Sequence, residues 1–253
     1  MCRFLQLAAL FYGLACCSTN VAAVEKIPLY SHYTTAPFAV DGVPTQSSCT
    51  LRLAAWLSSH SAARYQFEAR QIPRLRLNQV VARDDWQGVV TWANPLWFAD
   101  AERQHFLWSS ALMSDRNVLV SRQADGLRLP AQAPSRRLRL GGIAGHSYAD
   151  LQPLLQRDLL VREDAQSDLS NVFKLQHKRV DVVVLPASSL AYVRAQITGF
   201  EQWASISPMP QSSYQRFLFT SRANVPLMDY LQQALVQLGQ APEWAQCLAS
   251  PAP

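Results

Sequence analysis

The chain has 253 residues, of which 49% are hydrophobic and 16% are charged, so it contains enough apolar material for a folded core and is not a disordered chain. Its formal net charge is +5, but the 23 lysines and arginines are scattered along the sequence. No basic stripe interleaved with aromatic residues is present, which excludes a typical nucleic-acid-binding surface. Heptad runs and longer internal repeats are also missing, which excludes fibrous and solenoid architectures.

The N-terminal segment has the features of an export signal. Arg3 is the only charged residue within residues 1–23, and an apolar stretch over residues 4–15 is followed by small residues. This pattern predicts a signal peptide over residues 1–23 and hence a periplasmic protein. The apolar stretch is shorter than the ~20 residues of a membrane span. Lipidation at the cysteine pair 16–17 is the alternative.

Cleavage of the signal would leave Cys49 and Cys247 as the remaining cysteines. In an oxidising compartment such a pair suggests a disulfide, and two buried apolar thiols are the alternative. Two isolated cysteines and dispersed histidines do not have the spacing of a metal site. The sequence therefore predicts no metal and no cofactor.

Predicted strands and helices alternate in the first half of the mature chain. Runs of β-formers predict the strands, and apolar spacing behind a Ser/Thr cap or a proline predicts the helices. In chain order these are a strand over 27–33, a helix over 51–57, a strand over 65–69, a helix over 73–81 and a strand over 88–92. This order favours a largely parallel sheet covered by helices.

A second α/β series follows a segment rich in Pro, Ala and Arg at 123–137, which is typical of a domain boundary. Strands are predicted over 117–122, 138–143, 179–185 and 214–221, and helices over 146–160, 168–177, 188–196 and 225–238, with a last turn or helix over 244–248. The run at 179–185 is continuous enough for a central strand that is buried on both faces. Two such series with a return segment are expected of a two-lobed cleft protein, although the order also suits a doubly wound enzyme.

Motifs of common enzyme classes are missing from the chain. It contains no G-x-S-x-G, P-loop, H-E-x-x-H or dinucleotide-binding fingerprint. Glycines at 141–145 lie between a predicted strand and a predicted helix, but their spacing differs from G-x-G-x-x-G. We interpret them as a tight turn, at which Gly145, His146 and Ser147 offer N–H groups to an anionic part of a ligand.

Aromatic residues gather between positions 86 and 108. Core packing explains most of them, but Trp92 and Trp97 differ because Asn94 and Pro95 mark a loop between them, directly after a predicted strand. Loops at the carboxyl ends of parallel strands are where such sheets bind ligands. Aromatic side chains there provide apolar walls with a polar edge.

Six segments, taken in order along the chain, resemble those of one known family. They are Tyr33 with Pro37–Phe38, Asp100–Arg103, Phe106–Ser109, Val118–Arg122, Leu140–Ser147 and Leu175–Val184. Together they resemble the bacterial extracellular solute-binding proteins of family 3, which serve polar amino-acid transport. The resemblance covers nearly the whole mature chain.

The resemblance implies an α/β, type II periplasmic binding fold, with two lobes, a cleft between them and two hinge crossings. One lobe would comprise residues 24–121 and 213–253, and the other residues 122–212. In this fold the end of the chain returns to the first lobe, so Cys49 and Cys247 would be able to approach and form a disulfide.

The resemblance also implies a ligand site, with changes from the family pattern. Arg103 matches the arginine that clamps a ligand carboxylate, whereas Asp100 replaces a threonine and would repel that group. The acid that usually holds the ligand amine falls near Pro186, and His146 and Ser147 stand where two threonines are common. The ligand is therefore expected to differ from an ordinary amino acid. The predicted ligand-binding residues are Tyr33, Phe38, Trp92, Trp97, Asp100, Arg103, Gly145, His146 and Ser147.

These features predict a monomeric protein that captures a small polar solute, amino-acid-like or a small organic anion, by closing its lobes. Its partner would be an inner-membrane ABC permease or a sensor, and no catalysis is expected. Two alternatives remain: an exported lyase- or dehydratase-like enzyme on the same fold, with Asp100 or His146 as general acid or base, and a ligand-degenerate signalling module. Arg74 and Arg76 are further possible anion contacts, although exposed helix positions are the simpler interpretation.

Overall fold

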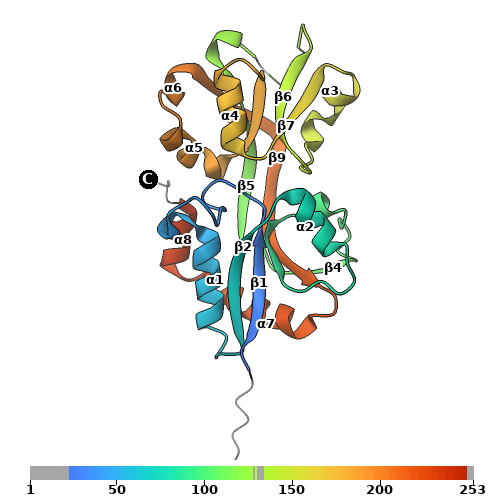
Figure 1. Cartoon of the computed structure of the whole chain (residues 1–253), viewed down its shortest axis with the longest axis vertical. Helices are drawn as coiled ribbons and strands as arrows, with labels where there is room; N and C mark the ends of the chain where they lie inside the picture. The colour runs from blue at the N-terminus through green and yellow to red at the C-terminus, as the bar shows by residue number, and fades with distance from the viewer. Residues whose placement is uncertain (1–22, 128, 130–133, 250–253) are drawn as a thin grey trace, which may run out of the picture.

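The computed structural model describes residues 23–127, 129 and 134–249, and all but the last position of the predicted signal peptide lies outside them. The described chain forms two α/β lobes, lower and upper in Figure 1, which are joined by two long strands. Within these residues, no helix has the length and apolar character that a membrane crossing requires.

The sheet of the first lobe has the strand order β2-β1-β3-β9, with β4 paired to β9. Strand β1 pairs in parallel with both β2 and β3, and β9 runs antiparallel to β3. The parallel part is the one that the alternating order of strands and helices predicted. The strands are β1 (Glu25–Ser31), β2 (Tyr65–Gln71), β3 (Val89–Ala93), β4 (Phe106–Trp108) and β9 (Ala204–Ser221).

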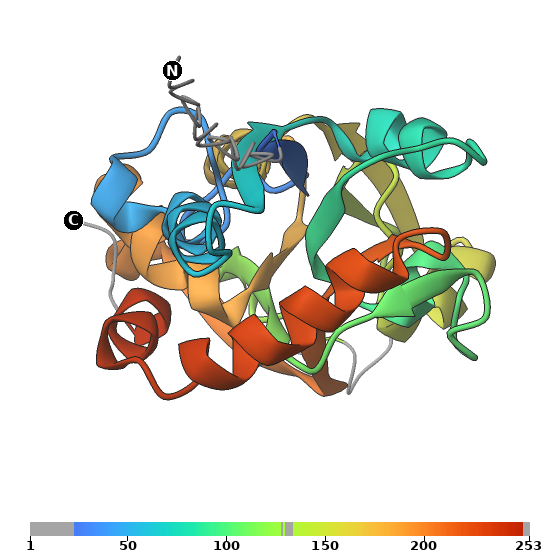
Figure 2. The same cartoon turned by 90° about the horizontal axis from the view of Figure 1, so that it is seen from below.

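Four helices pack on this sheet: α1 (Cys49–Ser59), α2 (Arg74–Val81), α7 (Val225–Leu238) and α8 (Pro242–Ala249). Ser48 caps α1 by accepting a hydrogen bond from the N–H of Leu51 at 3.1 Å. Leu53 and Leu231, from α1 and α7, are fully buried in the same hydrophobic cluster as Leu29 of β1. Figure 2 shows α7 crossing the lower end of the first lobe.

The sheet of the second lobe has the order β9-β5-β8-β6-β7. Its strands are β5 (Met113–Arg122), β6 (Leu138–Ile143), β7 (Leu160–Ala165) and β8 (Val182–Pro186), together with the first part of β9, and its helices are α3 (Gln152–Gln156), α4 (Asp168–Gln176), α5 (Leu190–Gln196) and α6 (Phe200–Trp203). Short 3-10 turns occur at Thr45–Ser47, Pro95–Phe98, Gln123–Asp125, Ala149–Leu151 and Ala187–Ser189. Every residue of β8 is buried, as expected for the most continuous apolar run of the sequence.

Two predicted elements differ from the structure. A helix was predicted over residues 146–160, but the helical part ends with α3 at Gln156, and residues 160–165 form the unpredicted strand β7, which pairs in parallel with β6 at the edge of the sheet. Their charged residues hide the strand pattern, because an edge strand needs only part of its surface buried. Strand β9 begins at Ala204, whereas the sequence predicted a strand over 214–221. Its first part was not predicted because this part is held by pairing with β5 rather than by its own apolar content.

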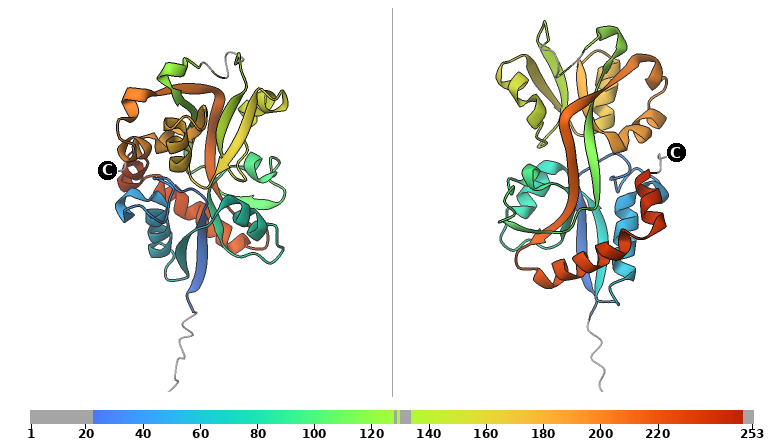
Figure 3. Two further views of the ribbon diagram at one scale, coloured as in Figure 1. Left: turned by 45° about the horizontal axis from the view of Figure 1, so that its top comes forward. Right: turned by 180° about the vertical axis from the view of Figure 1, so that it is seen from behind.

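Strands β5 and β9 cross between the lobes side by side, as Figure 3 shows from behind. They are antiparallel, with a register shift between Arg116 and Val118. Beyond this shift β5 also pairs with β8 of the second lobe, whereas the other end of β9 pairs with β3 of the first. A register shift bends the hydrogen-bonded ladder, so the regular pairing of the two crossing strands is interrupted at this point.

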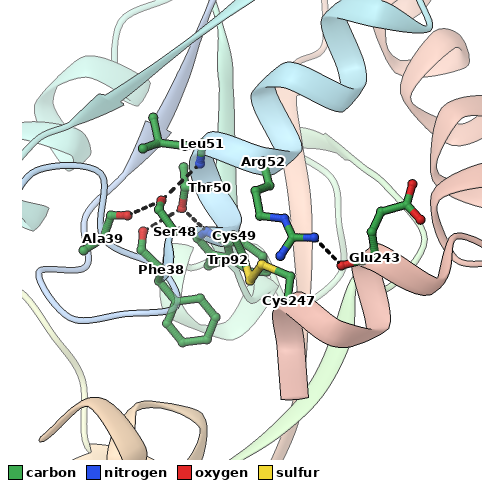
Figure 4. The surroundings of a disulfide bond; sticks show 10 residues. All are labelled: Phe38, Ala39, Ser48, Cys49, Thr50, Leu51, Arg52, Trp92, Glu243 and Cys247. Atoms are coloured by element: carbon green, nitrogen blue, oxygen red, sulfur yellow. Dashed lines mark hydrogen bonds between the residues drawn. A yellow bond between two sulfur atoms is a disulfide. The ribbon is translucent and has the colours of Figure 1, made fainter. Parts of the chain in front are cut away.

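A disulfide joins Cys49 at the start of α1 to Cys247 in α8, with a Cα–Cα separation of 5.8 Å (Figure 4). Both cysteines are buried in the main hydrophobic cluster of the first lobe. Nearby, Arg52 donates a hydrogen bond from Nη2 to the carbonyl of Glu243 at 2.6 Å. The disulfide therefore fixes α8 against α1, across 198 positions of sequence.

Candidate functional site

A cavity of about 50 Å³ lies between the lobes and takes its lining from both of them and from the crossing strands. We call it the inner pocket. Its lining residues are Tyr33, Arg74 and Trp97 of the first lobe, Asn117 and Tyr214 of the crossing strands, and His146, Ser147, Tyr148, Asp168, Val184 and Pro186 of the second lobe. An adjoining space of about 170 Å³ shares Trp97, Ser147 and Tyr214 with it.

Tyr33 reaches the inner pocket from a loop that is pinned to the first lobe. The hydroxyl of Ser31 donates to the carbonyl of Phe38 at 2.8 Å, and the hydroxyl of Thr50 donates to the same carbonyl at 2.6 Å. The N–H of Cys49 binds the carbonyl of Pro37 at 2.8 Å. These bonds close the loop after β1 onto the start of α1 and hold Tyr33 at the lobe boundary.

Arg216 lies beneath the pocket and is fully buried. It donates from Nε and Nη2 to Oδ2 of Asp115 at 3.0 and 2.9 Å, and from Nη1 to the hydroxyl of Tyr33 at 2.7 Å and the carbonyl of Trp92 at 3.1 Å. Nη2 also donates to the hydroxyl of Tyr214 at 3.1 Å. Burial alone would lower the pKa of Arg216, but Tyr33, Tyr214 and Asp115 raise it above its usual value. The guanidinium therefore stays charged, with its donors used inside the protein.

Asp115 connects this arginine to the second lobe. Its Oδ2 accepts a hydrogen bond from the hydroxyl of Ser188 at 2.7 Å, in addition to those from Arg216. Ser188 follows β8, whereas Tyr33 belongs to the first lobe. The buried ion pair on the crossing strands thus contacts both lobes, and it has no free group to offer a ligand.

Asp168 is the acid that lines the inner pocket. It begins α4 and is buried, and its Oδ2 accepts a hydrogen bond from the hydroxyl of Thr35 at 3.2 Å. Burial raises its pKa to about 6, although the Thr35 hydrogen bond and the charge of Arg216 act in the opposite direction. Arg74 supplies a positive charge to the same pocket, so the lining contains one group of each sign.

The predicted turn after β6 reaches the pocket. Gly145 has φ +82°, and the N–H of His146 closes the turn on the carbonyl of Ile143 at 2.9 Å. A Cβ atom at Gly145 would lie 3.0 Å from Cγ of Arg74, so the turn passes close to α2. His146 and Ser147 line the inner pocket directly, while Gly145 positions them.

Phe38 and Trp92, which were predicted as walls of the cleft, do not line the inner pocket. Both side chains are fully buried in the hydrophobic cluster of the first lobe. Trp92 donates from Nε1 to the hydroxyl of Thr50 at 2.7 Å, and its ring stacks with that of Trp244 at 5.9 Å. The ring of Phe38 lies 5.1 Å from that of Tyr33, and the guanidinium of Arg216 lies 4.3 Å from the Phe38 ring centroid. Trp97 does line the pocket, with its ring against Tyr214 at 4.8 Å.

Asp100 and Arg103, which were predicted as ligand contacts, also lie outside the lining of the inner pocket. The carboxylate of Asp100 accepts hydrogen bonds from the N–H groups of residues 104–106 at 2.6–3.1 Å and from Nε1 of Trp108 at 2.7 Å. The carboxylate therefore holds in place the loop that leads from Asp100 to β4. Arg103 is exposed and its guanidinium lies 4.7 Å from the ring centroid of Phe217, beside a separate open groove. Neither residue is among those that line the inner pocket.

Sequence reasoning missed several residues of the pocket, including Asn117, Tyr148, Asp168 and Tyr214. Asp168 had a local signal, because it follows the N-cap Ser167 and so sits in the first turn of a helix. Arg74 was expected to be exposed on its helix, but it is 6% exposed. No group of three metal-binding side chains occurs in the part of the chain that the structure describes.

Comparison with known proteins gives matches among solved structures only: no family model and no curated protein matches. One match is an ABC uptake transporter substrate-binding protein from Streptococcus pneumoniae with bound histidine (TM-score 0.71, 16% identity, 90% of this chain and 94% of that chain). A second is an ancestral arginine-binding protein bound to arginine (TM-score 0.68, 12% identity, 89% and 97%).

A third similar structure is an ancestral amino-acid-binding protein described as a precursor of cyclohexadienyl dehydratase (TM-score 0.66, 9% identity, 91% and 96%). These similarities extend over nearly all of each chain. They confirm the predicted fold: the chain has the two-lobed, type II periplasmic binding architecture.

Proposed function

We propose that this protein binds a small polar solute reversibly in the inner pocket and closes its lobes around it. The observation that carries this proposal is the lining of the pocket, to which both lobes and the crossing strands contribute side chains. A ligand that contacts both lobes stabilises the closed arrangement, because it loses its contacts with one lobe when the lobes separate. The similar structures with bound histidine and bound arginine support this reading.

The chemistry of the pocket suits an amino-acid-like solute or a small organic anion. Arg74 and Asp168 supply opposite charges, and Tyr33, Trp97 and Tyr214 supply aromatic surface. The arginine that the resemblance implied, Arg103, does not take part. Recognition therefore rests on residues of this chain that differ from the family pattern.

In this proposal the protein acts in the periplasm as a monomer and delivers its solute to an ABC permease or a sensor of the inner membrane, without a cofactor. The lobes divide near residues 121 and 213. Support for this division comes from β9, which changes its partner from β5 to β3 as it passes from one lobe to the other. The similar substrate-binding proteins of ABC transporters support the transport role.

An exported enzyme on the same fold is the second candidate, and the similarity to a dehydratase precursor favours it. Asp100 does not serve it as a general acid or base, because four hydrogen bonds occupy its carboxylate outside the pocket. Asp168 and His146 are the titratable groups that such an enzyme would use. Turnover that disappears in Asp168→Asn would support it over binding alone.

The proposal is tested by thermal unfolding of the mature protein with amino acids, opines, polyamines and small organic acids. A bound solute raises the melting temperature in a concentration-dependent way. Ser147→Trp, which fills the inner pocket, should abolish that shift, and Ser110→Trp at an exposed position serves as the control. A shift of equal size in both variants would place the solute elsewhere, and no shift with any class would overturn the proposal.

A further inference from the structure

Arg74 is a buried cation that has no counter-ion among the residues that the structure describes. Its side chain donates from Nε to Oδ1 of Asn78 at 2.9 Å and from Nη2 to the carbonyl of Trp97, and its guanidinium lies 4.1 Å from the ring centroid of Phe98. All of these partners are neutral. None of the ion pairs among the described residues includes Arg74, although it is only 6% exposed. An uncompensated buried charge is unfavourable, so an anion placed beside it gains more than it would at the surface.

Two histidines with unused ring nitrogens lie next to this cation. His32, from the loop after β1, is 5% exposed, and its ring meets that of His146 edge-to-face with centroids 5.1 Å apart. Neither Nδ1 nor Nε2 of His32, nor Nε2 of His146, has a hydrogen-bond partner in the described part of the chain. Burial, together with the charge of Arg74, lowers the pKa of both imidazoles, so each is neutral and carries one N–H donor.

These three residues separate the inner pocket from a larger cavity of about 520 Å³, which we call the outer pocket. Arg74 lines both pockets, His32 lines the outer one and His146 the inner one. The outer pocket takes its apolar lining from Ile72, Pro73, Leu75, Ile143, Ala144 and Ala165. Its polar lining is made of hydroxyl and amide groups, including Ser167 and Ser170 at the first turn of α4.

No aspartate or glutamate lines the outer pocket within the described residues. The pocket therefore offers one positive charge, the neutral imidazole of His32 and the N-terminal end of a nine-residue helix. The positive charge and the helix end favour a negative group, and the N–H of His32 can donate a hydrogen bond to it. The six apolar residues of the lining provide a surface for a short hydrocarbon body.

We propose that Arg74, His32 and His146 form a carboxylate-binding centre, and that the solute is an organic carboxylate whose apolar body lies in the outer pocket. This inference rests on the proposed function and names its substrate class. Arg74 presents Nη1, which makes no hydrogen bond with the described residues, to the carboxylate. The N–H of His32 donates to the same group, so binding satisfies the unpaired cation and the unpaired imidazole together.

The test uses the mature protein with sodium 4-methylpentanoate and with 4-methylpentanamide, which has the same apolar body but no charge. Sodium chloride at equal ionic strength is the reference for both. The carboxylate should raise the melting temperature in a concentration-dependent way, and the amide should not. Arg74→Gln should weaken carboxylate binding by about 10- to 100-fold, the usual effect of losing a hydrogen bond to a charged group.

Arg76→Gln is the matched control, because Arg76 lies on the same helix and is exposed. It should bind the carboxylate as the wild type does. Arg74→Lys keeps the charge but loses the planar fork, and should bind with intermediate affinity. Circular dichroism of each variant establishes that it is folded, and Arg74→Lys keeps the test decisive if Arg74→Gln unfolds.

The outcomes separate this inference from the proposed function. If the amide binds as well as the carboxylate, or if the Arg74 variants keep wild-type affinity, the carboxylate centre is wrong while solute capture stands. If zwitterions or polyamines bind at the inner pocket and the carboxylate does not, the inference fails in the same way. If no solute of either panel binds, both proposals are overturned.

Discussion

The hydroxyl of Thr35 donates a hydrogen bond to Oδ2 of Asp168 at 3.2 Å, across 133 positions of sequence. Thr35 belongs to the loop after β1 in the first lobe, and Asp168 begins α4 in the second. The same hydroxyl lies 3.2 Å from Oγ of Ser189 in the second lobe. All three residues are buried, so this contact joins the two lobes away from solvent.

The stability of the protein should depend on the protonation of Asp168. Its pKa is raised from 3.8 to about 6, so the folded protein holds this proton more tightly than the unfolded chain does. The resulting stabilisation is present below pH ~4 and is lost as the pH rises through about 6, by roughly 3 kcal/mol in total. Asp168→Asn should remove this part of the pH dependence and should be at least as stable as the wild type at pH 7.

Urea denaturation between pH 4 and 7 measures this difference. Asp229→Asn, at an exposed position of α7, is the control and should keep the wild-type profile. A profile of Asp168→Asn that runs parallel to that of the wild type would contradict the prediction.

The ion pair of Arg216 and Asp115 should be costly to break from one side. Both side chains are buried, at 0% and 3% exposure, and removing one leaves the other charge uncompensated. Arg216→Met or Asp115→Asn should each lower the free energy of unfolding by about 3–5 kcal/mol, and the double variant by less than the sum. Arg83→Met, which breaks the exposed pair with Asp85, should cost less than about 1 kcal/mol. Equal losses at the two sites in urea denaturation would refute this expectation.

Loss of the disulfide should destabilise the first lobe. The bond closes a sequence separation of 198 residues, and in the chain-entropy picture such a link stabilises by roughly 2–5 kcal/mol. Dithiothreitol should therefore lower the urea midpoint of the wild type, and should leave that of the double variant Cys49→Ala/Cys247→Ala unchanged. The exported protein should contain no free thiol in a colorimetric assay. Two titratable thiols in the folded protein would show that the bond is missing.

Asp100 should matter for stability and not for ligand binding. Burial alone would raise its pKa, but the hydrogen bonds from Trp108 and from the loop N–H groups lower it below its usual value. Asp100→Asn replaces an acceptor oxygen by an amide nitrogen, so at least one of these donors loses its partner, at a cost of about 1–3 kcal/mol. Calorimetry should then show unchanged solute affinity. The exposed Glu102→Gln is the control, and weaker binding in Asp100→Asn alone would return Asp100 to the site.

Local patterns in the sequence were sufficient for much of the architecture. Ser48 before the apolar residues of α1 marks the helix start, and the uninterrupted apolar run of β8 marks a buried central strand. Each of these signals depends on neighbours within a few residues, where side-chain period and capping decide the conformation. Strand β7 had no such signal, because it is held by pairing with β6 at the sheet edge.

The tertiary structure decided which charged side chains are buried at the site. The sequence contains many arginines, and nothing local distinguishes the buried Arg74 and Arg216 from the exposed Arg103. Arg216 is buried because Asp115, 101 positions away, meets it across the crossing strands. Arg74 is covered because the turn at Gly145 from the other lobe packs against it. Burial and pairing of a charge depend on groups that are distant in sequence, so the sequence by itself determined the lobes and only their packing determined which residues line the pocket between them.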